Sequence, residues 1–361
     1  MADPRPARLA ALRAALAAQA VDGVLLTDLA NIRYLTGFGG SNAVVAVTMT
    51  GILLVTDFRY QEQVKEEVGD FARVAIDLTS IWNALWRILP ELGATTMGFE
   101  SAHLVHREFA RVLQMGDKWM WRPLVDVVES LRERKDAGEL DAIARAAVVA
   151  TDALARTLPQ VRAGLTELQI AGILERELRD GGSTGFPFET IVASGARSAL
   201  PHARASGRTV CPGEFLLFDF GAVVDGYVSD VTRTFVVGRA SAEQREFYEV
   251  VREANARASA GVRPGMTGRD ADALARSYIE GRGFGESFGH GLGHGIGLEV
   301  HEAPRLSRTA EGMLPAGAVV TIEPGIYRAG WGGVRIEDDV VLEAAAPRIL
   351  TDFPRQLMEL A

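Results

Sequence analysis

The stretch Glu214–Phe235, with the sequence EFLLFDFGAVVDGYVSDVTRTF, carries the clearest structural signal in the chain. Two apolar-rich runs flank the dipeptide Asp225-Gly226, and Asp-Gly between such runs is a strong signal for a two-residue β-hairpin turn. We therefore predict that Val224 pairs with Tyr227, and this pair fixes the register of the whole hairpin.

This register places two aspartates on one face of the hairpin. Asp219 would oppose Thr232, two positions from Asp230 on the same strand, so the aspartates become diagonal neighbours roughly 7 to 8 Å apart at the backbone. Turn chemistry and solvent exposure explain Asp225. They explain Asp219 poorly, because an unpaired charge inside its apolar run is costly to bury. The pair is a candidate for metal ligation, since the metals of dinuclear hydrolases lie about 3.5 to 4 Å apart.

The glycine-rich stretch Phe288–Glu302, FGHGLGHGIGLEVHE, contains the histidines His290, His294 and His301. The spacing of His290 and His294 fits one helical face, but the glycines around them disfavour a regular helix. We expect these glycines to let the backbone approach a ligand closely. No phosphate-loop or dinucleotide-binding pattern is present, and His301-Glu302 lacks the second histidine of a zincin helix.

Two further stretches, Ala318–Glu323 and Gly333–Val341, are predicted strands, and on the second Arg335 and Glu337 share a face. Either glutamate alone could be a charge on an edge strand. Taken together, four carboxylates and one imidazole suit a pair of hard divalent cations. The five candidate ligands are Asp219, Asp230, His294, Glu323 and Glu337.

These motifs resemble those of the pita-bread metallopeptidases, which include methionine aminopeptidases, prolidases and aminopeptidase P. The resemblance covers residues 130–361 and, in weaker form, the first part of the chain. All five ligand positions carry the residue types of that family in the same order. The matching segments are 219–221, 229–235, 290–302, 323–327 and 334–338.

The resemblance implies an α/β fold with a C-terminal pita-bread (creatinase/aminopeptidase) domain and a smaller α/β creatinase-type N-terminal domain. We expect the domains at 1–126 and 134–361. Apolar runs at Gly23–Leu26 and Ile52–Val55, between helical patterns, also predict a small α/β first domain. In the second domain, helices would cover a strongly curved, mainly antiparallel sheet. Methionine aminopeptidases generally lack the N-terminal domain, which counts against that activity.

The resemblance also implies roles for the ligands. Asp219 would chelate one metal, Asp230 and Glu337 would bridge both, and His294 and Glu323 would hold the other. Glu323 would also be the general base. The implied cofactor is two divalent metal ions per subunit; manganese is the family expectation, with cobalt or zinc as alternatives for the same donors.

Substrate-side residues follow from the same resemblance. His202 and His301 would act beside the scissile carbonyl and His290 would line the pocket, although each could be an ordinary loop or capping histidine. Phe188 would form an apolar wall for proline, or be a core residue. Arg305 would bind a dipeptide carboxylate. Arg335 is a second substrate-binding candidate, or a support that orients the metal ligands.

The implied enzyme is a metallo-aminopeptidase that hydrolyses the bond between an N-terminal residue and a following proline, as an Xaa-Pro aminopeptidase or an Xaa-Pro dipeptidase. An Xaa-Pro bond is a tertiary amide without an N–H, so an apolar pocket suits it. The alternatives are an aminopeptidase of the same fold without a proline requirement and a non-catalytic binding module. The sequence leaves peptide length, first-residue preference and metal identity open.

Composition limits the partners. The 361 residues include 38 basic and 47 acidic residues, and the net charge of -9 disfavours nucleic acid and anionic membranes. The single cysteine, Cys211, excludes an intramolecular disulfide, fits a reducing compartment and is expected to be buried. Without an apolar spanning segment, we expect a cytoplasmic protein whose partners are short peptides with proline second. A homodimer is expected from the resemblance.

Overall fold

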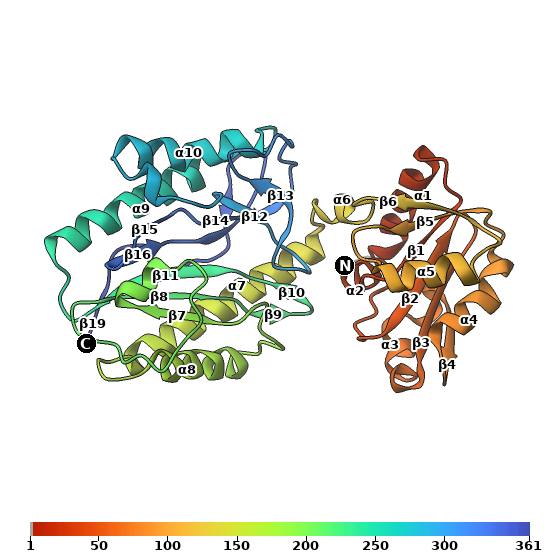
Figure 1. The fold of residues 1–361 in the computed structure, drawn as a ribbon, viewed down its shortest axis with the longest axis horizontal. Helices are drawn as coiled ribbons and strands as arrows, with labels where there is room; N and C mark the ends of the chain where they lie inside the picture. Colours follow the sequence, from red (N-terminus) through yellow and green to blue (C-terminus); the bar gives the residue numbers. More distant parts are fainter. Residues whose placement is uncertain (1–2) are drawn as a thin grey trace. The chain divides into compact units, whose positions relative to one another are not determined.

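The computed structural model describes residues 3–361 of the chain. The chain divides into two compact units, Met1–Arg132 and Glu133–Ala361 (Figure 1). Within residues 3–361, no helix is both long enough and apolar enough to cross a membrane.

The first unit is built around a six-stranded mixed sheet with the strand order β4-β3-β2-β1-β5-β6. The strands β1, β2 and β3 are antiparallel neighbours, whereas β4, β5 and β6 join by parallel pairing. The apolar runs predicted as strands form β1 and most of β3, which confirms that prediction. Side chains such as Leu25, Val55 and Leu85 form the core between the sheet and α4.

The elements of this unit are short. Its strands are β1 Gly23–Leu26, β2 Ala43–Thr48, β3 Ile52–Asp57, β4 Arg73–Asp77, β5 Thr96–Glu100 and β6 Met120–Leu124. Its helices are α1 Arg5–Ala18, α2 Leu29–Thr36, α3 Gln63–Glu67, α4 Ile81–Ile88, α5 His106–Met115 and α6 Glu129–Arg132. Its 3₁₀ turns are η1 Phe58–Tyr60, η2 Gly69–Phe71 and η3 Leu89–Leu92.

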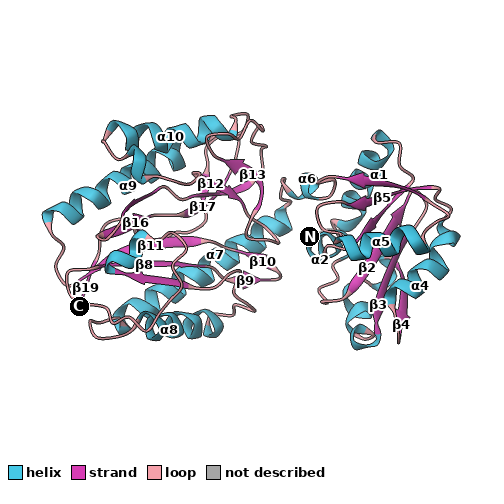
Figure 2. Ribbon diagram, viewed as in Figure 1, coloured by secondary structure: helices cyan, strands magenta, loops and turns pink. Residues whose placement is uncertain are grey.

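In the second unit, four helices flank the strands (Figure 2). The helices α7 and α8 pack on β7, β8 and β11 through residues such as Leu154, Leu174 and Phe218. On the other side, α9 and α10 pack on strands that include β14, through residues such as Val251 and Ile322. The helices are α7 Ala137–Thr157, α8 Glu167–Asp180, α9 Ala242–Gly261 and α10 Gly268–Gly281, and the 3₁₀ turns are η4 Leu158–Gln160, η5 Gly195–Ala199 and η6 Gly285–Ser287.

The strands of this unit are mainly antiparallel, as expected, but they form several ladders. A four-stranded sheet has the order β19-β11-β8-β7, a five-stranded sheet has the order β13-β12-β14-β17-β18, and β9-β10 and β15-β16 are two-stranded. The strands are β7 Ile191–Ser194, β8 Phe215–Phe220, β9 Val223–Val224, β10 Tyr227–Val228, β11 Val231–Val237, β12 Gly293–Gly295, β13 Glu302–Leu306, β14 Val319–Ile322, β15 Gly325–Arg328, β16 Gly332–Arg335, β17 Asp338–Val341, β18 Arg348–Ile349 and β19 Glu359–Leu360.

The hairpin predicted from Asp225-Gly226 is present with the predicted register. Tyr227 pairs with Val224, and Thr232 pairs with Asp219. Asp225 has a φ of 49° and Gly226 a φ of 75°. Both residues of the turn are therefore left-handed, which is the conformation that makes an Asp-Gly hairpin turn compatible with the twist of its strands.

Two local predictions are wrong. The stretch Gly333–Val341 is not one strand, because β16 ends at Arg335 and β17 begins at Asp338. Between them the backbone changes partners, since Glu337 N donates to Thr232 O at 3.1 Å. Cys211 is exposed rather than buried. It lies in the Cys-Pro-Gly turn before β8, where its own N–H donates to the carboxylate of Glu214 at 3.1 Å.

Candidate metal centre and substrate pocket

The five candidate ligands reach one cavity from five different segments. Asp219 lies on β8 and Asp230 immediately before β11, so the hairpin carries both. His294 lies on β12, Glu323 directly follows β14, and Glu337 lies in the break between β16 and β17. All five line a cavity of about 440 Å³.

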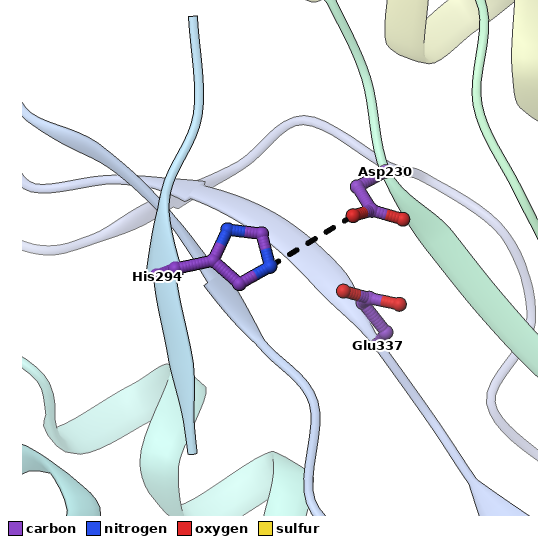
Figure 3. A group of neighbouring side chains, drawn as sticks. All are labelled: Asp230, His294 and Glu337. Atoms are coloured by element: carbon purple, nitrogen blue, oxygen red, sulfur yellow. Dashed lines mark ion pairs between the residues drawn. The ribbon is translucent and has the colours of Figure 1, made fainter. Parts of the chain in front are cut away.

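Three of the five already form a compact group. Asp230, His294 and Glu337 each offer one ligand atom, and these atoms lie within 4.8 Å of one another. Figure 3 shows the imidazole of His294 facing the two carboxylates from a separate strand. Glu323 adds to the group, with its Oε1 3.4 Å from His294 Nε2. Asp219 lines the same cavity, where Arg335 holds its Oδ2.

The glycine-rich segment that carries His294 is not helical, as predicted, and two of its glycines pack closely against neighbouring strands. A Cβ atom on Gly293 would lie 2.0 Å from Thr321 O, and one on Gly295 would lie 2.0 Å from Ala303 O. These glycines let neighbouring strands approach the backbone, and Gly293 also lines the cavity, so the expectation that the glycines let the backbone approach a ligand stays a prediction.

Without a cation, the carboxylates oppose one another. Burial raises the pKa of Asp230 and of Glu337 well above the usual range, and the charges of neighbouring carboxylates raise both further. Burial also raises the pKa of Glu323 to about 7, with Asp219 adding to the effect and Arg335 opposing it. Clustered carboxylates that disfavour their own ionisation are stabilised by a bound cation.

The donor chemistry fits divalent metal ions. Burial lowers the pKa of His294 to about 4, so its imidazole is neutral at pH 7 and can ligate through a ring nitrogen. Two buried oxygens, Asp219 Oδ1 and Asp230 Oδ1, have no hydrogen-bond partner among residues 3–361. Buried oxygens of this kind need a partner, and oxygen-rich sites with one imidazole suit hard or borderline divalent cations.

Behind the candidate ligands, a hydrogen-bond network fixes the orientation of their side chains. Thr232 Oγ1 donates to Glu337 Oε2 at 2.6 Å and accepts from Arg335 Nε at 3.0 Å. Arg335 also contacts Asp219, and its Nη1 donates to Tyr327 Oη at 2.9 Å. These contacts favour the alternative in which Arg335 supports the ligands over a role in substrate binding.

The predicted substrate-side residues all line the same cavity, namely Phe188, His202, His290, His301 and Arg305. The ring of His301 lies 4.4 Å from that of His294, and burial lowers the pKa of His301. His290 Nε2 is 2.9 Å from Tyr327 Oη, and burial lowers the pKa of His290 to about 4. Phe188 precedes β7 and is half-buried, so it is not an ordinary core residue.

Two residues of the network, Thr232 and Tyr327, are not among the site residues predicted from the sequence. Thr232 could have been found, because the hairpin register places it opposite Asp219. Tyr327 lies on β15, and its hydroxyl reaches Arg335 on β16 and His290 in the loop before β12. No local pattern indicates that contact.

Comparison with known proteins agrees with the motifs. Residues 141–344 match the model of metallopeptidase family M24, and residues 8–134 match that of the creatinase/prolidase N-terminal domain. An Xaa-Pro dipeptidase from Pyrococcus furiosus is 34% identical over 94% of this chain and 95% of its own length.

Two solved structures are similar along nearly the whole chain. An Xaa-Pro dipeptidase from Bacillus anthracis has a TM-score of 0.94 and 38% identity, covering 99% of this chain and 100% of its own. An X-Pro aminopeptidase from Thermotoga maritima MSB8 has a TM-score of 0.91 and 37% identity, covering 98% and 99%. These matches confirm the predicted fold class. The chain therefore belongs to metallopeptidase family M24, in the pita-bread branch that also carries a creatinase/prolidase N-terminal domain, and it is a metallopeptidase.

Proposed function

We propose that the protein hydrolyses the peptide bond between an N-terminal residue and a following proline, using two divalent metal ions. The observation that carries this proposal is the convergence of five ligand-type side chains on one cavity, two of them with buried oxygens that have no partner in the described part of the chain. The names of the relatives, Xaa-Pro dipeptidase and X-Pro aminopeptidase, support the choice of substrate.

The metals would be held by Asp219, Asp230, His294, Glu323 and Glu337. When bound, two such cations polarise a carbonyl and provide a nucleophilic water at neutral pH. Glu323 would accept the proton of the attacking water and pass it to the leaving nitrogen, which becomes the amine of the product. Glu323 is placed for this role, because its Oε1 lies within the ligand group, 3.4 Å from His294 Nε2.

The other side chains position the substrate. His301 has a lowered pKa, so at pH 7 a neutral imidazole faces the cavity, and its N–H can donate to the carbonyl oxygen as that oxygen gains charge. We assign His202 to the same oxygen, because it lines the same cavity. Phe188 would form the apolar wall against the proline ring, and Arg305 would bind the carboxylate of a dipeptide in a bidentate contact.

Three finer proposals accompany this function. Manganese is the metal we favour, because the ligand set is mostly carboxylate oxygen. We propose the cytoplasm as the location, because a single cysteine fits a reducing compartment. A homodimer is proposed from the frequency of two-fold assemblies. Elemental analysis, cell fractionation and analytical ultracentrifugation test them in turn.

Hydrolysis of Ala-Pro, Ala-Pro-Ala and Ala-Ala-Ala by metal-stripped protein, with and without manganese, tests the proposal. We expect cleavage of the proline-containing peptides only when the metal is present. Cleavage of Ala-Ala-Ala alone would replace the proposed function with an aminopeptidase that has no proline requirement.

A further inference from the structure

An ion pair lies at the open side of the same cavity. Arg204 Nε and Glu189 Oε2 are 3.1 Å apart, and their side chains are 82% and 62% exposed. Both residues line the cavity that contains the ligand cluster, yet neither has a part in the chemistry proposed above. The ligands are largely buried, so the pair marks the mouth of the cavity and the ligands mark its floor.

The backbone on both sides of this pair is held firmly. Arg197 Nη2 donates to the carbonyl of Arg204 at 2.5 Å, and Arg197 is itself paired at 3.0 Å with Glu167, whose side chain is fully buried. On the opposite side, Pro187 packs against Gly221, where an added Cβ would lie 2.7 Å from Pro187 Cγ. The two side chains can therefore separate while the segments that carry them stay in place.

The pair itself is weak. Exposed ion pairs contribute little to stability, because water screens the charges and two long side chains lose freedom. An arriving carboxylate can therefore replace Glu189 as the partner of Arg204 at small cost. The guanidinium group is also well suited to this exchange, because its planar fork binds carboxylates in a bidentate contact.

Arg204 is a second arginine on the cavity wall that a peptide longer than a dipeptide can use. If the scissile bond lies at the ligand cluster, Arg305 is the proposed partner for the carboxylate of Xaa-Pro. Each further residue extends a peptide by about 3.3 to 3.6 Å, so a third residue carries its carboxylate towards the open side. Arg204 is a second exposed arginine on the wall of this cavity.

We propose that Arg204 binds the C-terminal carboxylate of tripeptides with proline at the second position, and that Glu189 pairs with Arg204 when no such peptide is bound. This inference rests on the proposed function, since it takes the ligand cluster as the place of hydrolysis. The pair Arg204 and Glu189 then sets how well tripeptides compete with dipeptides.

The test compares kcat/KM for Ala-Pro, Ala-Pro-Ala and the amide Ala-Pro-Ala-NH₂ in manganese-loaded wild type, Arg204→Gln and Glu189→Gln. Arg204→Gln should lower the ratio of Ala-Pro-Ala to Ala-Pro by about fivefold, mainly through KM, which is the size expected for one exposed charge contact. Glu189→Gln should raise the same ratio, because it frees Arg204. Neither substitution should change the ratio of kcat/KM for Ala-Pro-Ala-NH₂ to that for Ala-Pro, because the amide has no C-terminal carboxylate.

Arg308→Gln is the matched control, since Arg308 is exposed, pairs with Glu280 at 3.8 Å and is not part of the cavity lining. An unchanged ratio in Arg204→Gln overturns the inference while leaving the proposed function intact. The inference is also overturned if Glu189→Gln raises KM for both Ala-Pro and Ala-Pro-Ala. That result would mean that the carboxylate of Glu189 holds the substrate's ammonium group. Ala-Pro-Ala that is neither cleaved nor inhibits Ala-Pro cleavage also overturns it. A wild-type enzyme that cleaves neither peptide refutes the proposed function, and the inference with it.

Discussion

The ion pair between Asp272 and Arg276 on α10 attaches the glycine-rich segment of the site to that helix. Its side chains are only 2% and 7% exposed, and Arg276 contacts both carboxylate oxygens, at 2.5 and 2.7 Å. Asp272 Oδ1 accepts from Leu292 N at 3.0 Å, and Arg276 Nη2 donates to His290 O at 2.7 Å. We therefore expect the substitution Asp272→Asn to destabilise the second unit strongly.

The magnitude follows from burial. Asparagine keeps the shape of the side chain but leaves the Arg276 cation in the interior with only neutral acceptors, and breaking a buried pair in this way costs about 3 to 5 kcal/mol. Glu253→Gln is the matched control, because Glu253 and Arg257 have the same spacing on α9 at 2.8 Å but are 32% and 54% exposed. That change should cost about 0.3 to 0.5 kcal/mol.

Differential scanning calorimetry of the metal-free protein measures the difference. For a domain of this size, each kcal/mol lowers Tm by about 2 to 4 °C, so Asp272→Asn should lower the Tm of the second unit by about 6 to 20 °C. Tryptophan fluorescence assigns the transitions, because most of the 5 tryptophans lie in the first unit, at positions 82, 86, 119 and 121. A Tm for Asp272→Asn equal to that of Glu253→Gln would show that the buried pair does not stabilise the second unit.

Three other substitutions test a candidate metal ligand, a hydroxyl of the site's hydrogen-bond network and a histidine of the first unit. Glu337→Gln should abolish metal binding and lower kcat/KM for Ala-Pro by more than about a hundredfold, because a ligand matters more than its supports; full activity with unchanged metal content contradicts this. Tyr327→Phe removes the hydroxyl that contacts His290 and Arg335, and should lower kcat/KM about tenfold; unchanged kinetics would show that the hydroxyl is not needed. In the first unit, burial lowers the pKa of His103, but Asp28 and Glu129 outweigh it and the net shift is upward. The stabilisation from protonated His103 is therefore complete below about pH 6.5 and is lost as the pH rises through the pKa of the folded state. Urea unfolding should show that, above about pH 6.5, the wild type loses more stability than His103→Gln. Equal losses in the two proteins would contradict the raised pKa of His103.

The hairpin could be predicted because its signals are local. Asp225-Gly226 determines the turn, the turn determines the register, and the register places Thr232 opposite Asp219. Each step depends on residues close in sequence, so the rest of the fold does not enter the prediction.

The break at Glu337 could not be predicted in the same way. Residues 333–341 alternate like a single strand, and only the bond from Glu337 N to Thr232 O, a residue far away in the sequence, shows that the backbone changes partners there. The glycines at 293 and 295 present the same problem, because the carbonyls that require them belong to Thr321 and Ala303. The prediction for Cys211 is wrong because residue type alone indicates burial, although the Pro-Gly that follows is itself a turn signal.

In the candidate site, too, some features follow from the local sequence and others depend on residues far away in the chain. The residue types and their order in the chain are sufficient to indicate the five candidate ligands, which the structure places around one cavity. The supporting role of Arg335 is favoured only by its contacts with Asp219, Thr232 and Tyr327, which join separate strands. A side chain's partners across strands depend on packing, which a single sequence does not record.

Titration of metal-stripped protein with manganese, with Ala-Pro hydrolysis followed at each addition, tests whether the five side chains hold two catalytic metal ions. We predict that hydrolysis is absent without metal and rises until two equivalents are bound per chain, as a two-metal site requires. Full activity without metal, or saturating manganese with no cleavage of Ala-Pro, would contradict it.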